Sequence, residues 1–518
     1  MQAITMSLKT ILNNKKFINS DGVDNYPPIC VVNYLSDSDV WTVIPQIIHV
    51  NISREETALT QRCSFVVCNV NPDNIGDYGF FNPHRSDTTH SKPANDWYKI
   101  LRGGRRIQVL MNYGVDNLVT VFTGVIDTVN MNINPTKATL EIDCRDFGRA
   151  LCDQIVNSII TVSGKKFNEI TYPLGADITA VWLDSGDTDP TLRDIVKDII
   201  MRAGLDDELI VNNNVLYHDW LLSETNLEDD MPWENMTWAE CIEKIKTVSG
   251  YHFWFDSNSI PHLDYTQKRA LNYLNEGVEL DDDVYSSLLN PQAYNLVVKS
   301  NNLVTTYVEG VDYIVDYSTA QLARILPGTS IPDNEVVKVS YDSVDWIFKN
   351  GINIMNLPLI LSINEMYAGV KVMSGDGLEC TLLFDNRKID DDGNVTNTSY
   401  GFSGGSNVMW DGAVINEDKI KIICDSNLGS NEQCEALAAR LMYDMIDRYS
   451  NPEFICMAIP HLEMFDLVKL IVYGTAGGAL GDAYIIDGIT LNYEAPVKMT
   501  MRLKTHYYRK ISDQYIAE

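Results

Sequence analysis

The chain has 518 residues and carries 40 Lys and Arg against 71 Asp and Glu, which gives a formal charge of −31. A surface that acidic repels phosphate, so sequence-specific binding of DNA or RNA is not expected. At roughly 150 residues per domain the length predicts about three or four domains. A hydrophobic content of 45% supplies a core for each of them.

No apolar run is long enough to cross a bilayer, so the sequence predicts no transmembrane helix. The first residues, MQAITMSLKTILNNKKF, lack the apolar stretch and cleavage site of a signal peptide, which predicts synthesis in the cytosol. Ten cysteines without framework spacing are typical of reduced, mostly buried thiols. Cys63 and Cys68, five positions apart in a strand-like segment, should lie on opposite faces and share neither a disulfide nor a metal.

Residues 1–40 are polar and interrupted by Pro27 and Pro28, so we expect an N-terminal arm with one or two short strands. From 41 to 152, alternating apolar and polar positions predict several strands separated by Asn, Gly and Pro turns. A polar loop covers 72–95. The first domain is therefore expected to be a small β-barrel or sandwich with this loop as a large excursion.

The pattern becomes helical in the next domain, expected at 153–289. The helix expected in TLRDIVKDIIMRAGL has Asp189-Pro190 at its start and Gly204 at its end. In TWAECIEKIKTVSG, Thr237 and Glu240 have capping-box spacing, and Gly250 ends the expected helix. The following YHFWFD and IPHLDY predict a hairpin, so this domain is mixed α/β. The apolar stripes expected to be buried are Leu192, Ile195, Val196, Ile199, Ile200 and Ala203 in the first helix and Trp238, Cys241, Ile242, Ile245 and Val248 in the second.

Strand patterns return over 290–505, where we expect a second small β-barrel. One long helix interrupts them near SNEQCEALAARLM, where Ser430 and Gln433 have capping-box spacing. The end of the chain, 506–518, is a basic tail. Positive charge gathers there around two tyrosines, either to dock on an acidic neighbour or to balance the local field, and the residues are Arg502, Lys504, Tyr507, Tyr508, Arg509 and Lys510.

Two β-rich stretches share one spacing, RRIQVLMNYG…VFTGVIDTVNMNINPTKATLEIDCR and DLVKLIVYG…AYIIDGITLNYEAPVKMTMRLK. A constant offset across several strands indicates that one β unit is used twice. The sequence therefore predicts a β-rich α+β protein in which two duplicated small β-barrels flank a mixed α/β domain. The matched positions, 360 apart until a single insertion makes the last pair 361 apart, are Tyr113 with Tyr473, Asp127 with Asp487, Asn132 with Asn492 and Lys137 with Lys498.

These phrases resemble a known family. A strand ending in Tyr-Gly, a Phe-Thr-Gly-Val-Ile-Asp segment, another strand and then CRDFGRALCD is similar to the first barrel of baseplate hub proteins from phage tails and related contractile injection systems. FICMAIPHLEMFDLVKLIVYG to the basic last strand looks like their second barrel, and MTWAECIEKIKTVSGYHFWFDSNSIPHLDY like the α/β piece between the barrels. The resemblance covers roughly 41–300 and 430–505, and we treat 301–430 as an insertion of unknown role.

The resemblance implies a structural homotrimer of the virion, assembled in the host cytoplasm. Two barrels from each of three chains would form a pseudo-six-fold ring that joins the tail tube to a three-fold spike, with the spike, tube, tape-measure and other baseplate proteins as partners. An acidic channel lining would keep DNA from adhering, although the charge also serves solubility.

Motifs for chemistry are weak, and we assign no catalytic, cofactor-binding or metal-binding residue. Ser403 in GFSGG has nucleophile-elbow spacing but no flanking strand and helix. The glycine-rich GTAGGALG at 474–481 joins two strands, unlike a phosphate cradle. Asp390–Asp392 lack the later residues of a calcium loop. His252 and His262 flank the predicted hairpin and could meet across it, but two ligands make no tetrahedral site.

Other acidic groups are expected to cap a helix or to lie in solvated loops; they are Asp184, Asp187, Asp189, Glu228–Asp230 and Asp281–Asp283. Two alternatives to the hub remain, both placed in 301–430. One is a cell-wall-degrading enzyme that uses Ser403 or Asp390–Asp392, and the other is a carbohydrate-binding adhesin. The sugar platforms of the adhesin would be Trp346, Tyr367 and Trp410.

Overall fold

A computed structural model gives the fold of the chain. It describes residues 28–56, 58–71, 74–78, 100–113, 118–134, 137–155, 191–205, 210–211, 236–264, 271–280, 285–289, 292–316, 321–325, 329–349, 353–358, 367–375, 377–383, 387–389, 394–397, 419–445, 452–471, 479–494 and 497–506.

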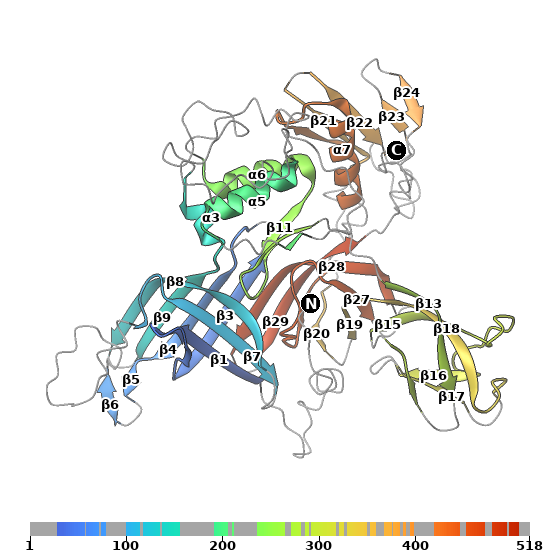
Figure 1. Cartoon of the computed structure of the whole chain (residues 1–518), viewed down its shortest axis with the longest axis horizontal. Helices are drawn as coiled ribbons and strands as arrows, with labels where there is room; N and C mark the ends of the chain where they lie inside the picture. Colours follow the sequence, from blue (N-terminus) through green and yellow to red (C-terminus); the bar gives the residue numbers. More distant parts are fainter. Residues whose placement is uncertain are drawn as a thin grey trace.

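The protein is β-rich, and its largest element is a sheet of 13 described strands that forms the lower left and centre of Figure 1. We call it the main sheet. Its first half has the order β2-β1-β7-β8-β9-β4-β3. These strands are β1 Pro28–Leu35, β2 Trp41–Val43, β3 Ile47–Glu55, β4 Arg62–Cys68, β7 Arg106–Tyr113, β8 Val119–Asn134 and β9 Lys137–Arg145.

The second half of the main sheet comes from the C-terminal part of the chain. It continues the first half through an antiparallel pairing of β3 with β28, in which Asn51 faces Asn492. Its order is β28-β29-β26-β20, with β27 also paired to β28 and β19 paired to β27. Its strands are β19 Trp346–Lys349, β20 Ile354–Asn356, β26 Glu453–Cys456, β27 Leu467–Ile471, β28 Ala479–Tyr493 and β29 Lys498–His506.

Among the described pairings of the main sheet, three strands have a partner on one side only, namely β2, β20 and β19. The β-rich class agrees with the sequence, but within the described strands no closed barrel is found. A short separate hairpin of β5 (Val70–Asn71) and β6 (Asn74–Tyr78) lies in the predicted polar loop. Strand β1 falls inside the expected N-terminal arm, yet it pairs with β7 from Pro28 to Tyr34 and so belongs to the main sheet.

Alternation explains why these segments are strands. Along β4 the side chains of Cys63, Phe65 and Val67 are buried, whereas those of Ser64, Val66 and Cys68 are only half-buried, so the two cysteines lie on opposite faces as predicted. One hydrophobic core collects the inward residues of both halves, including Phe122 of β8 and Phe454 of β26. The two halves are therefore packed as one body.

The duplicated unit has the predicted strand order in both places, because β7-β8-β9 and β27-β28-β29 are antiparallel meanders. The β8–β9 pairing shifts register between Ile126 and Thr128, and the β28–β29 pairing shifts between Ile486 and Gly488. The bulge therefore falls at Asp127 in one copy and at the matched Asp487 in the other.

The entry into the first strand also matches between the copies. Gly104 donates its backbone N–H to Ile126 O at 2.8 Å, and Phe465 donates to Ile486 O at 2.9 Å. Both residues have a left-handed backbone, with φ of 82° at Gly104 and 63° at Phe465. The two left-handed residues are 361 positions apart and the two bulges are 360 apart, so both meanders share these local irregularities at nearly the same spacing.

Above the main sheet lies an α/β part, which we call the upper tier (Figure 1). The predicted start of the second helix is confirmed, since Thr237 forms a capping box with Glu240, and Gly250 ends this helix with φ of 78°. The first helix begins with a capping box of Thr191 and Asp194 that was not predicted, and the expected start at Asp189-Pro190 lies outside the described residues. The apolar stripes predicted for the two helices are buried. The elements are α3 Arg149–Asp153, α5 Leu192–Arg202, β10 Ile210–Val211, α6 Trp238–Ser249, β11 His252–Phe255 and β12 Pro261–Asp264.

A distant stretch of chain completes the upper tier. The apolar residues of α7 and of a five-stranded sheet share one core with α5 and α6. At the start of α7, Ser430 accepts from the backbone of Gln433 as predicted, but Gln433 accepts from Gly429 N, so only half of the capping box forms. The elements are β21 Gly369–Met373, β22 Glu379–Leu383, β23 Arg387–Ile389, β24 Val395–Asn397, β25 Ile420–Cys424 and α7 Asn431–Met445.

Residues 271–343 form a separate β unit at the right of Figure 1, which we call the outer unit. It contains two three-stranded sheets around its own core. The stretch 301–430 is thus not one insertion, because it is divided among the outer unit, the main sheet and the upper tier. The strands of the outer unit are β13 Leu271–Leu280, β14 Ser286–Ser287, β15 Ala293–Lys299, β16 Tyr313–Asp316, β17 Gln321–Arg324 and β18 Glu335–Ser343.

Candidate functional site

Most loop motifs considered for chemistry lie outside the described residues. The glycine-rich segment at 474–481 does connect β27 to β28, as predicted for a loop between two strands. The other motifs lie outside the described residues and remain predictions; they are Ser403, Asp390–Asp392, Asp184, Asp187, Asp189, Glu228–Asp230 and Asp281–Asp283.

The structure does not support a sugar platform made of Trp346 and Tyr367. Trp346 lies in β19 and is fully buried in the core of the main sheet, where its ring meets that of His461 at 5.1 Å. Tyr367 packs against the core of the upper tier, with Lys419 Nζ 5.0 Å from its ring centroid. Trp410 lies outside the described residues. Trp346 was misjudged because a tryptophan in a short strand gives no sign of which face is covered.

Half of the predicted basic cluster is engaged within the chain. Arg502 pairs with the bulge residue Asp487, and Lys504 Nζ lies 3.9 Å from Glu56 Oε1. Arg509 and Lys510 lie outside the described residues, as do the two tyrosines. The described members therefore balance local carboxylates, which is the second of the two roles considered.

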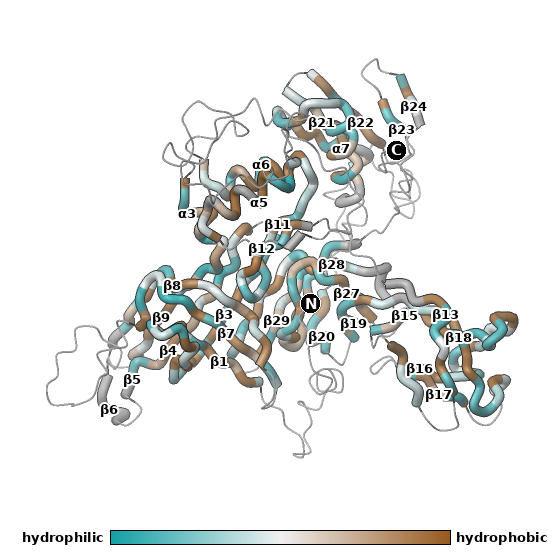
Figure 2. The backbone as a smooth tube through the Cα atoms, viewed as in Figure 1, coloured by the Kyte–Doolittle hydropathy of each residue, from teal (hydrophilic) through white to brown (hydrophobic). Residues whose placement is uncertain are grey.

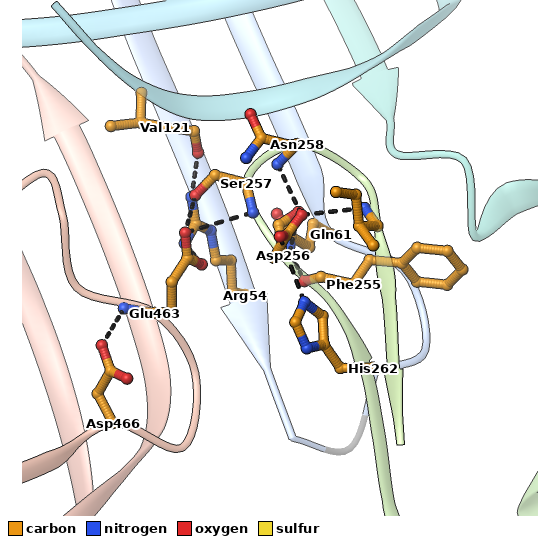
Figure 3. Close-up of polar contacts among 11 residues, drawn as sticks. Arg54, Gln61, Val121, Phe255, Asp256, Ser257, Asn258, His262, Glu463 and Asp466 are labelled. Atoms are coloured by element: carbon orange, nitrogen blue, oxygen red, sulfur yellow. Dashed lines mark hydrogen bonds and ion pairs between the residues drawn. The ribbon is translucent and has the colours of Figure 1, made fainter. Parts of the chain in front are cut away.

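The densest polar contacts join the main sheet to the upper tier, at the tip of the β11–β12 hairpin (Figure 3). We call this set the junction network: Arg54, Gln61, Asp256, Ser257, His262 and Glu463. Arg54 comes from β3, and Glu463 comes from the loop before β27. Arg54 Nη1 donates to Glu463 Oε2 at 2.7 Å, with 4% and 9% of the two side chains exposed. The pair therefore joins the two halves of the main sheet in a dry environment.

Ser257, at the hairpin tip, joins both charged groups. It accepts from Arg54 Nη2 at 2.8 Å, and its hydroxyl donates to Glu463 Oε1. Arg54 Nη2 also donates to the carbonyl of Val121 on β8. Both oxygens of Glu463 are thus occupied, and its backbone N–H donates to Asp466 at 2.8 Å. The hairpin tip is held by charge-assisted hydrogen bonds to two charged groups, Arg54 and Glu463.

Asp256 shapes the turn between β11 and β12. Its Oδ1 accepts from Asn258 N at 2.8 Å and from Ile260 N at 2.9 Å, and its Oδ2 lies 3.3 Å from His262 Nε2. Burial disfavours the charged carboxylate, but these hydrogen bonds outweigh it and hold the pKa of Asp256 below its usual value. Gln61 then fixes the strand end by donating to the carbonyls of Phe255 and Asp256.

His252 and His262 do not meet across the hairpin, although the sequence analysis considered that they could. A row of rings separates them, with Phe465 4.8 Å from His252 and 4.6 Å from Trp254, and Trp254 stacked 5.1 Å from His262. His252 Nδ1 lies 2.9 Å from Glu56 Oε1. Burial raises the pKa of Glu56, but His252 and Lys504 lower it more, to about 2.

Asp146 contributes to the junction network through its contact with Gln61. It is fully buried where β9 meets α3, and it accepts from Gln61 N at 2.9 Å and Gly148 N at 3.1 Å. Burial is the largest influence and raises the pKa of Asp146 to about 8, although the two backbone donors and Arg54 act in the opposite sense.

The junction network has the residue types of a hydrolytic site but not the connections. A serine nucleophile needs a base within hydrogen-bond reach. Ser257 donates to Glu463, a carboxylate already paired with Arg54, while His262 contacts Asp256, so these contacts include no Ser–His pair. The arrangement therefore acts as a fastening between two parts of the protein. Sequence analysis missed it, because Arg54 and Glu463 are 409 positions apart and neither belongs to a motif.

An open pocket of about 480 Å³ lies beside β20, at one end of the main sheet. Its lining includes Asn356, Phe454, Asp487 and Arg502. In the described part of the chain, no group of three His, Cys, Asp or Glu side chains could hold a metal ion. None of the described helices is long and apolar enough to cross a bilayer.

No protein family model matches the chain. In sequence, 75 residues, or 14% of the chain, are 40% identical to the tail sheath protein of Burkholderia phage BcepMu. The match spans only 16% of that relative.

Solved structures of tail proteins match most of the chain at low identity. The tail protein of Neisseria meningitidis MC58 has a TM-score of 0.46 and 10% identity, over 93% of this chain and 97% of its own. The 43 kDa tail protein of prophage MuSo2 from Shewanella oneidensis has a TM-score of 0.45 and 11% identity, over 92% and 97%. A chain of the phage P2 baseplate has a TM-score of 0.27 and 8% identity, over 93% and 100%.

Proposed function

We propose that the protein is a non-enzymatic hub of a phage tail or tail-like particle, a trimer that adapts a six-fold tail tube to a three-fold spike. Tube, spike and tape-measure proteins would be its neighbours in the baseplate. Each copy of the duplicated meander, with the strands around it, would form a barrel-like module of the ring. The upper tier and the outer unit would lie outside this ring.

One observation carries the proposal, namely the duplicated meander with its bulges at Asp127 and Asp487. Three chains with two such meanders each supply six similar modules, which is what an adaptor between six-fold and three-fold symmetry needs. The β3–β28 pairing fixes the relative orientation of the two modules within a chain.

Two of the open edges of the main sheet, β2 and β20, suit a ring. A cyclic trimer needs head-to-tail contacts between two different surfaces of each chain. At one end β2 presents Trp41 and Val43, and at the other β20 presents Met355 beside the open pocket. Pairing of these ends between neighbouring chains would satisfy backbone groups that a monomer leaves open.

The channel lining would be the polar face of the main sheet. Asn51 and Ser53 of β3 and Thr490 and Asn492 of β28 face away from the core and continue from one half of the sheet into the other. These four side chains are uncharged, although the cross-strand neighbours Arg62 and Lys498 add cationic groups to the same face. Three chains, each with a formal charge of −31, would add a repulsive field along the channel.

Light scattering on the purified full chain, alone and with its spike, tests the proposal, and we expect the mass of a trimer. Val43→Lys should weaken the trimer, because Val43 lies at the β2 end and is 57% exposed. Val395→Lys, in the upper tier and 59% exposed, is the matched control and should leave the mass unchanged. A monomer at high concentration in the presence of the spike would contradict the hub.

A further inference from the structure

The outer unit exposes apolar side chains along one short stretch. Five of them lie within 303–314, a stretch that includes two loop segments and the start of β16. In Figure 2 hydrophobic segments recur along the outer unit at the right. The exposed fractions are 45% for Leu303, 80% for Val304, 55% for Val308, 60% for Val311 and 39% for Ile314. We call these five residues the outer apolar patch, and such a group on one unit marks an interaction site.

Hydrogen bonds hold the first loop of the patch in one shape. Ser300 N donates to Thr305 O at 2.8 Å, and Thr305 N donates to Ser300 Oγ at 3.0 Å. Asn302 Oδ1 accepts from Val304 N at 3.1 Å. Leu303, between them, has a φ of 62°, which is rare for a bulky side chain. The loop therefore holds Leu303 in a strained conformation in which Leu303 and Val304 are exposed.

The second loop is fixed by Asp312. This carboxylate accepts from Val308 N at 2.8 Å and from the backbone N–H and hydroxyl of Ser330, at 3.0 Å and 2.6 Å. Tyr307 and Tyr313, next to the patch residues, are buried in the core of the outer unit. The patch is thus preorganised beside a completed core, so binding would cost little ordering entropy.

Charge decides what could cover the patch. Residues 271–343 contain three Lys and Arg against eleven Asp and Glu, a formal charge of −8. The outer unit of a second copy, which carries the same charge of −8, would be repelled at this patch, as would an anionic membrane surface. We propose that the outer apolar patch docks a different protein, one that offers an apolar pocket bordered by Lys and Arg. This inference is independent of the proposed trimer.

The test places the photo-crosslinker p-benzoylphenylalanine at Val304 in the full chain, co-expressed with the proteins encoded on either side of its gene. Val395 carries the crosslinker in the control. We expect one foreign protein to be crosslinked from Val304 and not from Val395, through a segment with apolar residues flanked by Lys or Arg. Crosslinks only to another copy of the chain, to lipid, to an acidic segment or to nothing would overturn the proposal.

Variants measure the contribution of the patch. Val304→Ser with Val308→Ser should weaken binding of the crosslinked protein at least tenfold, whereas Val395→Ser with Ile422→Ser, equally exposed, should not. Raising salt from about 0.1 M to about 1 M should slow association, since it screens the charge complementarity. Equal affinity of both double variants would contradict the assignment even if a partner is found, and unchanged thermal unfolding would verify the fold.

Discussion

At the scale of single residues, the junction between the main sheet and the upper tier depends on buried charge. Arg54 and Glu463 form an ion pair that water barely reaches, and Ser257 connects both to the hairpin. A buried pair costs desolvation, so it adds little net stability compared with apolar residues. Its geometry does specify which loop the hairpin tip contacts, because any other contact would leave a buried charge unpaired.

Removing one partner should therefore be costly. We expect Arg54→Met or Glu463→Gln to lower the free energy of unfolding by about 3–5 kcal/mol, because the remaining group is left buried without its counterpart. The double variant Arg54→Met with Glu463→Leu should be more stable than either single one. Urea unfolding followed by tryptophan fluorescence measures this, with Trp254, which stacks on His262 of the junction network, as a reporter.

The control uses an ion pair of the same length in a wetter place. Arg324 Nη1 lies 2.7 Å from Asp333 Oδ1, but Asp333 is 55% exposed. Asp333→Asn should cost less than about 1 kcal/mol. If Glu463→Gln and Asp333→Asn cost the same, burial is not what makes the junction pair important.

Asp146 should make stability depend on pH. Burial raises its pKa to about 8 in the folded protein, whereas an unfolded aspartate has a pKa of about 3.9. The folded state therefore retains a proton that the unfolded chain releases, and this stabilisation is full below about pH 4 and is lost as pH rises through about 8.

The measurement compares the wild type with Asp146→Asn, which stays neutral at every pH. The free energy of unfolding of the wild type should fall by up to about 1.4 kcal/mol per pH unit more than that of the variant between about pH 5 and 8. Parallel pH profiles would mean that Asp146 is ionised in the folded protein.

At the scale of elements, the left-handed position before the first strand of the meander holds a different residue in each copy. Gly104 takes the left-handed backbone in the first copy without strain. Phe465 takes it in the second copy, where its ring contacts His252 and Trp254 of the hairpin. In the second copy, the strained backbone at Phe465 places an aromatic ring against the upper tier, a contact that Gly104 cannot make in the first copy.

Helix ends couple the two stretches of the upper tier. Arg440 of α7 donates to the carbonyls of Lys246 and Thr247 at the end of α6, at 3.2 and 3.3 Å. A Cβ on Gly250 would lie 2.6 Å from Arg440 Nη1, while one on Gly204 would meet nothing within 4 Å. Both glycines have positive φ, so alanine pays the same backbone cost of roughly 1–2 kcal/mol at either.

We therefore expect Gly250→Ala to destabilise the protein by about 1 kcal/mol more than Gly204→Ala, because Arg440 is displaced from its hydrogen bonds. In an Arg440→Ala background the two alanine variants should cost the same, which a double-mutant cycle by thermal or chemical unfolding measures. A difference that survives removal of Arg440 would show that the extra cost has another source.

At the scale of the whole molecule, the described residues form three hydrophobic cores. One core serves both halves of the main sheet, one serves the upper tier, and one serves the outer unit. Tyr113 of β7 adds a hydrogen bond across the main sheet by donating to Ala458 O at 2.9 Å. The two copies of the meander should therefore unfold together, whereas the outer unit should open separately.

Hydrogen exchange with mass spectrometry tests this division. Phe454→Ala, expected to cost about 3–5 kcal/mol, should speed exchange in both β7-β8-β9 and β27-β28-β29. Val339→Ala, in the core of the outer unit, should speed exchange within 271–343 and leave both meanders protected. Faster exchange in only one meander after Phe454→Ala would mean that the two halves are separate folding units.

The sequence by itself determined the local features. The capping box at Thr237, the stop at Gly250 and the β11–β12 hairpin were predicted from residues within a turn or two of one another. The repeat was also readable, since the spacing around Asp127 and Asp487 keeps the same register along the chain. Helix caps and alternation are short-range, so a linear pattern specifies them.

Only the tertiary structure decided which surfaces meet. Alternation tells which face of a strand is apolar but not which strand lies beside it, so the placement of β1, β19 and β20 in the main sheet was not predicted. The same holds for α7, which completes a core begun about 200 residues earlier in the chain. The pairing of Arg54 with Glu463 was not predicted for the same reason, because the two residues become buried neighbours only when the strands have packed together.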